Sequence, residues 1–260
     1  MGRRAEGTDG PADCKGGAEV EIWAHRGASA VAPENTLAAF QAALLAGADG
    51  IELDVQLTRD GVVVVIHDET LERTTDGSGF VHEKTWAELA RLDAGRWFHP
   101  DFRGERVPRL EDVLMWVRGT NLKLNIELKN ALFPMPGLEE TVVALLHRHD
   151  LVERTVLSSF NHESVRRLRR DHPEVRAAIL YVARLFDPCR YLAAIGGADL
   201  HPYYLTVSPE LAAHAAACGA RVRAFTVDRP EDIRLLQAYG VHGVITNRPA
   251  EARQALLAVP

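Results

Sequence analysis

The sequence predicts an α/β fold in the form of a closed (β/α)8 barrel with a small insertion after its second strand. Short apolar β-like runs alternate with amphipathic helical segments along the 260 residues, and this alternation is typical of a parallel sheet. Eight repeats fit a (β/α)8 barrel, which commonly occupies about 250 residues as one domain. An open doubly wound sheet usually carries a glycine-rich phosphate loop after its first strand. The corresponding stretch here, HRGASAVAPENT, lacks that loop, which favours the closed barrel.

Each expected strand is a short apolar run bounded by turn residues. The strands are expected at residues 20–25, 50–57, 123–129, 155–160, 176–181, 199–205, 221–227 and 243–246. The segments between them place apolar residues at i, i+3 and i+4, and several begin with Asn, Asp or Ser and end at Gly, as capped helices do. Helices are expected at residues 35–47, 110–119, 138–150, 161–172, 187–197, 208–219, 229–240 and 248–258.

One segment interrupts the alternation. The stretch QLTRDGVVVVIHD predicts a β-hairpin that turns on Asp60 and Gly61, because Asp-Gly is a strong turn signal. Residues 69–108, which follow, are polar with scattered aromatic residues and are too long for an ordinary βα connection. They are expected to form an insertion over one end of the barrel.

The register of this hairpin decides where His67 lies. If Asp60 and Gly61 are the only loop residues, His67 falls opposite Asp54; a shift of the loop by one residue places it opposite Leu53 or Glu52 instead. In each register, His67 returns to the same end of the second strand.

Composition excludes several classes of function. The formal net charge is -6 and the basic run RRLRRDHPEVR is interpreted as a solvated helix face, so no nucleic-acid partner is expected. No apolar run approaches the roughly eighteen residues that a membrane span needs. Residues 1–18 lack an apolar signal region and are expected to form a flexible tail before a single domain at residues 19–260. Cys14, Cys189 and Cys218 are odd in number and far apart, which predicts a cytoplasmic protein without disulfides or structural zinc.

Charged residues occur inside two of the expected strands. Side chains alternate along a strand, so Glu52 and Asp54 share one face, as do Glu127 and Lys129. Strands of a parallel barrel are normally apolar on both faces, so these charges are interpreted as facing the barrel axis; charges on a solvated strand face are the alternative. Three carboxylates that converge from adjacent strands predict a site for one divalent cation, Mg²⁺ or Ca²⁺.

Two histidines accompany these carboxylates. His25 and Arg26 end the first expected strand, and His67 follows the hairpin; each of these histidines is otherwise open to a purely structural role. Active sites of (β/α)8 barrels lie at the carboxyl ends of the strands. There one histidine can remove a proton from an attacking oxygen while the other protonates a leaving alkoxide. Arg26, Lys129 and a cation can neutralise a phosphodiester, so the pattern indicates phosphoryl chemistry.

The chain resembles the glycerophosphodiester phosphodiesterases. The resemblance rests on AHRG with PENT, GIELDVQLTRDGVVVVIHD, LNIELK, SSFN and GVHGVITNRP, which span residues 24–249. It implies a TIM barrel that hydrolyses a small-molecule glycerophosphodiester to glycerol 3-phosphate and an alcohol. Attack by the glycerol 2-hydroxyl, through a cyclic phosphate, is often the family's route, and either histidine could act first.

The resemblance also implies residue roles. Glu52, Asp54 and Glu127 would hold the metal, and His25 and His67 would form the acid/base pair. The implied substrate contacts are Arg26, Lys129, Glu34 and Phe225, with His201 either at the mouth or packed inside. One departure is FTVD in place of the family's common WTVN, which puts the Asp228 charge near the expected glycerol end.

Two alternatives stay open. A lysophospholipase D-type activity on the same barrel would need an apolar entry surface, for which FHPDF and LFPMP are possible elements. A non-catalytic phosphate-binding barrel would be expected to lack at least one of the histidines or carboxylates, and the sequence retains all of them.

Overall fold

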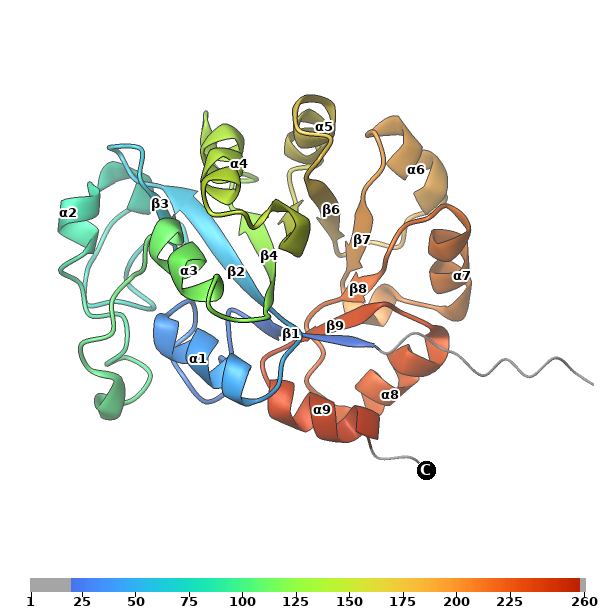
Figure 1. The fold of residues 1–260 in the computed structure, drawn as a ribbon, viewed down its shortest axis with the longest axis horizontal. Coiled ribbons are helices and arrows are strands. Elements are labelled where there is room, and N and C mark those ends of the chain that lie inside the picture. The colour runs from blue at the N-terminus through green and yellow to red at the C-terminus, as the bar shows by residue number, and fades with distance from the viewer. Residues whose placement is uncertain (1–19, 258–260) are drawn as a thin grey trace, which may run out of the picture.

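The computed structural model describes residues 20–257, in which eight parallel strands form a nearly closed barrel with helices outside it (Figure 1). The expected tail at residues 1–18 lies outside the described residues. The order around the barrel is β7-β6-β5-β4-β2-β1-β9-β8, and single bridges Leu200–Val222 and Tyr203–Phe225 join the β7 and β8 segments. The strands are β1 (Glu21–His25), β2 (Gly50–Leu57), β4 (Lys123–Leu128), β5 (Thr155–Ser159), β6 (Arg176–Tyr181), β7 (Asp199–Pro202), β8 (Arg223–Ala224) and β9 (Gly243–Thr246).

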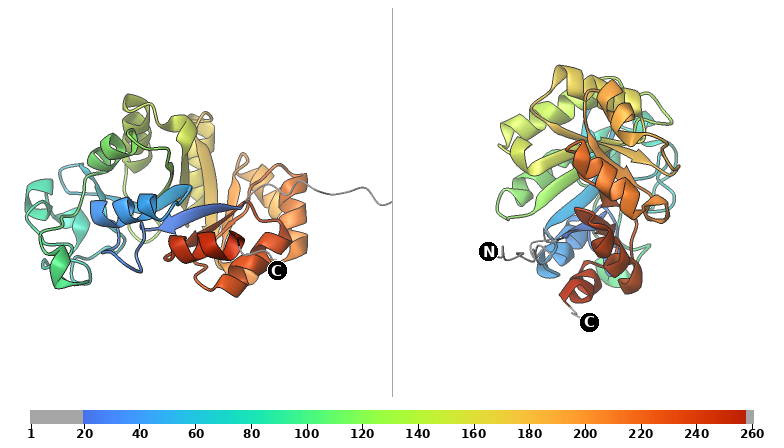
Figure 2. Two further views of the ribbon diagram at one scale, coloured as in Figure 1. Left: turned by 60° about the horizontal axis from the view of Figure 1, so that its bottom comes forward. Right: turned by 90° about the vertical axis from the view of Figure 1, so that its right-hand side faces the viewer.

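The eight expected helices are all present and surround the strands (Figure 2). Polar side chains fix several of their starts, as at Thr36, whose hydroxyl accepts a hydrogen bond from the Ala39 amide, and at Asn161, Asp187 and Ser208. The helices are α1 (Leu37–Leu45), α3 (Leu110–Val117), α4 (Leu138–Arg148), α5 (His162–Asp171), α6 (Pro188–Ala194), α7 (Pro209–Ala217), α8 (Pro230–Tyr239) and α9 (Pro249–Leu257).

The β8 strand is much shorter than the seven residues expected at 221–227. It lies at the seam of the barrel, where the Phe225 amide donates to the Pro202 carbonyl and the Val227 amide donates to the Ile245 carbonyl. These single bonds go to different neighbouring strands, so no continuous ladder forms beyond Ala224.

The expected hairpin is present, and its register is one of those that the sequence left open. Strand β3 (Val63–Val65) runs antiparallel to β2 with Val55 opposite Val65 and Leu57 opposite Val63. The loop therefore contains three residues, 59–61, and Gly61 takes the left-handed backbone (φ +79°) that such a loop requires. In this register the position opposite His67 is Leu53, one of the two alternatives that a shifted loop allows.

The segment between β3 and α3 carries its own small apolar core, which includes Ile66, Leu71, Val81, Leu89 and Val107. It lies beside β3, on the side of the molecule away from α6 and α7 (Figure 1). Its short elements are η1 (Val81–Glu83), α2 (Trp86–Leu89) and η2 (Pro100–Phe102).

The two leucines between the charged strand residues lie on the outer face of the barrel. Leu53 and Leu128 are buried in one apolar cluster with residues of α3 and α4, such as Leu114 and Val142. Because side chains alternate along a strand, this packing turns Glu52, Asp54 and Glu127 toward the barrel interior.

The expectation that the chain has no disulfide is wrong. Cys189 of α6 and Cys218, which follows α7, form a disulfide across 29 residues of sequence. The two helices are neighbours on the outside of the barrel, so fold topology brings together two cysteines whose spacing gives no local signal (Figure 1). The cysteines therefore no longer indicate a reducing compartment. Among the described residues, no helix is long and apolar enough to cross a membrane.

Candidate active site

Three carboxylates meet inside the barrel toward the carboxyl ends of β2 and β4. Asp54 lies opposite Glu127 in the ladder between these strands, and Glu52 lies two residues before Asp54 on β2. One oxygen from each carboxylate lies within 4.8 Å of one oxygen from each of the other two. The convergence expected from the alternating ELD and ELK patterns is therefore present.

Burial and mutual repulsion oppose full ionisation of the three carboxylates in this cluster. Burial, followed by the charges of Asp54 and Glu127, raises the pKa of Glu52 well above its usual value. Burial and then Asp54 raise the pKa of Glu127 to about 7. Burial also opposes ionisation of Asp54, but Arg26, His67 and Lys129 together hold the pKa of Asp54 below its usual value.

This cluster fits an oxygen-ligated divalent cation. The Asp54 Oδ1 atom is buried and has no hydrogen-bond partner among the described residues. A buried carboxylate oxygen without a partner is costly, and a cation in contact with it would remove that cost. The donors are all hard carboxylate oxygens, which suit Mg²⁺ or Ca²⁺.

Two cationic side chains border the cluster. The Lys129 Nζ atom donates to Glu127 Oε1 at 2.9 Å and lies 3.9 Å from Asp54 Oδ1. The Arg26 Nε atom lies 3.5 Å from Asp54 Oδ2, and the Arg26 backbone amide donates to Glu52 Oε2 at 2.9 Å. Arg26 and Lys129 thus border the cluster, one beside each oxygen of Asp54.

His25 ends β1 and is anchored through Nδ1. That nitrogen lies 2.7 Å from Oδ1 of Asn247, the residue that follows β9. The Ser29 hydroxyl lies 2.8 Å from the same amide oxygen. Burial, followed by the Arg26 charge, lowers the pKa of His25 to about 4, so its ring is neutral near pH 7.

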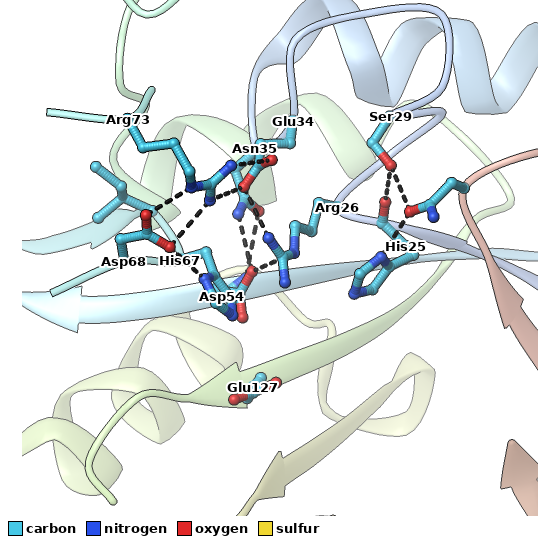
Figure 3. Close-up of polar contacts among 12 residues, drawn as sticks. His25, Arg26, Ser29, Glu34, Asn35, Asp54, His67, Asp68, Arg73 and Glu127 are labelled. Carbon is cyan, nitrogen blue, oxygen red and sulfur yellow. Dashed lines mark hydrogen bonds and ion pairs between the residues drawn. The ribbon is translucent and has the colours of Figure 1, made fainter. Parts of the chain in front are cut away.

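His67 is anchored through the same ring nitrogen but by a carboxylate. Its Nδ1 lies 2.6 Å from Asp68 Oδ1, and Arg73 donates to both oxygens of Asp68. The Arg73 hydrogen bonds, against the opposing effect of burial, hold the pKa of Asp68 well below its usual range. Figure 3 shows this chain of polar contacts, from His67 through Asp68 and Arg73 to Glu34.

Glu34 binds two arginines and lies outside the group of three carboxylates. Its Oε1 accepts from Arg26 Nη1 at 2.8 Å, and Arg73 donates to both of its oxygens. Burial opposes ionisation of Glu34, but these arginines hold its pKa below its usual value. In this structure the Glu34 carboxylate therefore binds the guanidinium groups of Arg26 and Arg73.

The two remaining residues expected to contact substrate, Phe225 and His201, have different environments. Phe225 is partly exposed and stacks edge-on with Phe160 and Tyr203, at centroid distances of 5.9 and 6.3 Å. His201 is 0 % exposed, and burial, followed by Arg223, lowers its pKa to about 3. No part of its ring reaches the mouth, which corresponds to the packed histidine of the two alternatives.

Sequence reasoning missed several polar residues of the site. Asn35, the first residue of an expected helix, donates from Nδ2 to Asp54 Oδ2 at 2.9 Å and has a left-handed backbone (φ +58°). Asp68 and Arg73 lie within or beside the segment treated as an insertion. An asparagine inside PENT and an aspartate directly after the expected catalytic histidine were the available signals.

Asp228 also has hydrogen-bond partners that the sequence did not identify. Its carboxylate turns to the end of β9, where it accepts hydrogen bonds from the Thr246 hydroxyl and from the backbone and side-chain amides of Asn247. The motif TNRP contained this partner, but only the fold shows that β9 ends beside both Asp228 and His25.

Comparison with known proteins identifies the family of this chain. The model of the glycerophosphoryl diester phosphodiesterase family matches residues 25–251. The glycerophosphodiester phosphodiesterase of Caldanaerobacter subterraneus subsp. tengcongensis is 43% identical over 228 residues, which cover 88% of this chain and 94% of that protein. The enzyme of the same name from Bacillus altitudinis is 39% identical over 236 residues, or 90% and 96% of the two chains.

Solved structures show the same fold. A phosphodiesterase from Oleispira antarctica, in complex with the product sn-glycerol-3-phosphate, has a TM-score of 0.83 at 32% identity and covers 91% of this chain and 96% of its own. The glycerophosphodiester phosphodiesterase of Agrobacterium tumefaciens C58 has a TM-score of 0.81 at 33% identity, with 90% and 99% covered. The chain therefore belongs to the glycerophosphoryl diester phosphodiesterase family, a family of phosphoric diester hydrolases.

Proposed function

We propose that this enzyme is a metal-dependent glycerophosphodiester phosphodiesterase that releases glycerol 3-phosphate and an alcohol by two-histidine acid/base catalysis. The observation that carries the proposal is the buried group Glu52, Asp54 and Glu127, bordered by Arg26 and Lys129. Both His25 and His67 hold Nδ1 against a protein acceptor, which leaves Nε2 of each ring for proton transfer.

In the proposed site, Glu52, Asp54 and Glu127 hold one divalent cation, Mg²⁺ or Ca²⁺. When bound, the cation supplies Lewis-acid stabilisation of charge on the phosphoryl oxygens. Arg26 and Lys129 lie on either side of Asp54, where they neutralise the substrate phosphate and the greater charge of its transition state.

The histidines divide the proton transfers. His25 is neutral near pH 7 because burial lowers its pKa to about 4, so it suits the base that takes the proton from the glycerol 2-hydroxyl as its oxygen bonds to phosphorus. The bond from phosphorus to the head-group oxygen then breaks, and His67 gives that oxygen a proton. Water opens the resulting cyclic phosphate in a second step with the two roles exchanged.

The test is hydrolysis of glycerophosphocholine with Mg²⁺ or Ca²⁺, followed by enzymatic detection of glycerol 3-phosphate. The proposal predicts product with metal and its loss after chelation, with recovery when the metal is restored. A metal-stripped enzyme with undiminished turnover would contradict the metal mechanism. Product without any cyclic intermediate in rapid-quench samples would instead indicate direct attack by water.

One observation favours a second candidate, the lysophospholipase D-type activity. The loops after β4, β6 and β7 expose apolar side chains at the carboxyl end of the barrel, among them Leu132 (74 % exposed) and the fully exposed Phe186. Exposed apolar side chains at the mouth would suit the acyl chain of a lysophospholipid. Turnover of lysophosphatidylcholine should be compared with that of glycerophosphocholine, and a strong preference for the lipid would replace the leading proposal.

A further inference from the structure

We propose that Asp228 is a positioning residue that determines which nitrogen of His25 carries the proton. It acts through Asn247, whose side chain lies between the Asp228 carboxylate and the His25 ring. The effect on turnover rests on the proposed function, because it requires His25 to transfer protons. The effect on the His25 tautomer rests on the hydrogen bonds alone.

The Asp228 carboxylate is held in place by three donors from the end of β9. Its Oδ1 accepts from the Thr246 hydroxyl at 2.9 Å and from the Asn247 backbone amide at 2.8 Å. Its Oδ2 accepts from Asn247 Nδ2 at 2.6 Å. These bonds join the loop after β8 to the end of β9, so the carboxylate has a defined position relative to Asn247.

This carboxylate leaves Asn247 only one orientation. An ionised carboxylate accepts hydrogen bonds and cannot donate, so the amide nitrogen of Asn247 must face Asp228. The amide oxygen must then face the opposite way, toward His25 Nδ1 at 2.7 Å and the Ser29 hydroxyl at 2.8 Å. Without Asp228, either orientation of the amide could satisfy His25, because a neutral imidazole has one donor and one acceptor nitrogen.

The orientation of Asn247 in turn fixes His25. An amide oxygen only accepts, so Nδ1 must be the protonated nitrogen of the neutral ring. The lone pair is therefore on Nε2, the nitrogen that no described protein group engages in a hydrogen bond. The chain of hydrogen bonds from Asp228 through the neutral amide of Asn247 to His25 thus leaves Nε2 of His25 as a proton acceptor. His67, by contrast, is anchored directly by a carboxylate.

A purely structural role for Asp228 is the alternative, since the same bonds hold the end of β9. The two roles differ under an exchange of side chains. In D228N the new amide has one donor and one acceptor where the carboxylate had two acceptors, so Asn247 is free to turn. In the double variant D228N/N247D, the amide at 228 donates to a carboxylate at 247, and that carboxylate accepts from His25 Nδ1 as Asn247 does in the parent enzyme.

The experiment combines nitrogen-15 NMR of histidine-labelled, Mg²⁺-loaded enzyme with steady-state kinetics. The shifts and long-range couplings of the ring nitrogens report the tautomer, and the His25 signals are assigned by their loss in H25Q. The matched control is D232N, which makes the same change on an α8 residue whose carboxylate pairs with Arg229. The melting temperature of each variant is measured alongside.

We expect a protonated Nδ1 in the parent enzyme, in D232N and in the double variant, and a mixture of tautomers in D228N. For D228N kcat should fall at least about tenfold, with a much smaller change in KM, and the double variant should regain most of that loss. A protonated Nε2 in the parent enzyme, or an unchanged tautomer in D228N, would overturn the proposal.

Failure of the proposed function would look different. A parent enzyme without diesterase activity would remove the kinetic measurement but leave the NMR comparison decisive. Loss of activity in D228N that the double variant does not recover, with a lowered melting temperature and an unchanged tautomer, would assign Asp228 a structural role only.

Discussion

Asp54 lies directly opposite Glu127 on neighbouring strands β2 and β4, and both carboxylates are turned into the barrel. Two carboxylates this close in a buried site repel each other when both are ionised, which raises the pKa of at least one of them. The two pKa values shift in opposite directions. Arg26 and Lys129 favour the ionised form of Asp54, whereas Glu127 has a pKa of about 7. The pair therefore links metal binding to proton release.

This linkage predicts how pH changes stabilisation by metal. The pKa of Glu127 is raised from 4.5 to about 7 in the folded protein without metal. The folded state thus holds a proton that the unfolded state releases, and the contribution of Glu127 to stability falls as pH rises from about 4.5 to 7. Mg²⁺ must displace this proton, so its binding is weaker at low pH.

The increase in melting temperature caused by a fixed Mg²⁺ concentration should therefore be larger at pH 7.5 than at pH 5.5. Differential scanning fluorimetry measures it directly. The control is E127Q, in which the pH dependence of the Mg²⁺ effect should be reduced along with the effect itself. An equal Mg²⁺ shift at both pH values in the parent enzyme would show that no proton is displaced.

The histidine assignment predicts large losses of turnover without loss of fold. H25A and H67A should each lower kcat by about 10²-fold or more, the usual contribution of a general acid or base. H99A is the matched control, because His99 is exposed and caps η2 in the segment between β3 and α3. Steady-state assays and melting temperatures together check the prediction, and near-normal turnover in either active-site variant would remove that residue from the assignment.

The packing of Leu53 predicts a stability effect separate from catalysis. Leu53 is 0 % exposed and lies between β2 and the outer helices, so L53A should lower the free energy of unfolding by about 2–5 kcal/mol. L45A removes the same atoms from a side chain that is 79 % exposed, and its effect should be within about 0.5 kcal/mol. Urea unfolding of both variants measures the difference; equal effects would mean that the outer core is not where the structure places it.

The disulfide gives a prediction that is independent of the active site. Non-reduced, denatured enzyme should react with a thiol reagent at a single cysteine, because Cys189 and Cys218 are joined. Closing a loop of 29 residues should stabilise the fold by roughly 3–4 kcal/mol in the chain-entropy description, and the variant C189S/C218S should lose that amount. Three reactive thiols in the non-reduced enzyme, with no loss of stability in the variant, would contradict the pairing.

The sequence predicted most of the fold because the signals that it used are local. Alternation of apolar residues placed Glu52 and Asp54 on one face of β2. Helix periodicity with polar residues at the helix starts located α1, whose N-cap in the structure is Thr36. The length of β8 was not predictable, since it depends on how the barrel closes at Phe225 rather than on the β propensity of residues 221–227.

The candidate site was predicted only in part, for the same physical reason. Glu52, Asp54, Glu127 and Lys129 follow from strand alternation, which needs no knowledge of tertiary contacts. The side chain that binds His25 Nδ1 belongs to Asn247, which lies 222 positions away in the sequence. Only barrel closure brings the end of β9 beside β1. The sequence left the hairpin register open because a two-residue and a three-residue loop share the same Asp-Gly signal.

The central claim is that the buried carboxylates hold a cation required for hydrolysis of a glycerophosphodiester. The most direct measurement is glycerol 3-phosphate release from glycerophosphocholine by enzyme stripped of metal, before and after addition of Mg²⁺ or Ca²⁺. The account predicts negligible release without metal, full release with at least one of the two ions, and little recovery in E52Q or E127Q at the same metal concentration. Release by the stripped enzyme at the rate of the metal-loaded enzyme would contradict it.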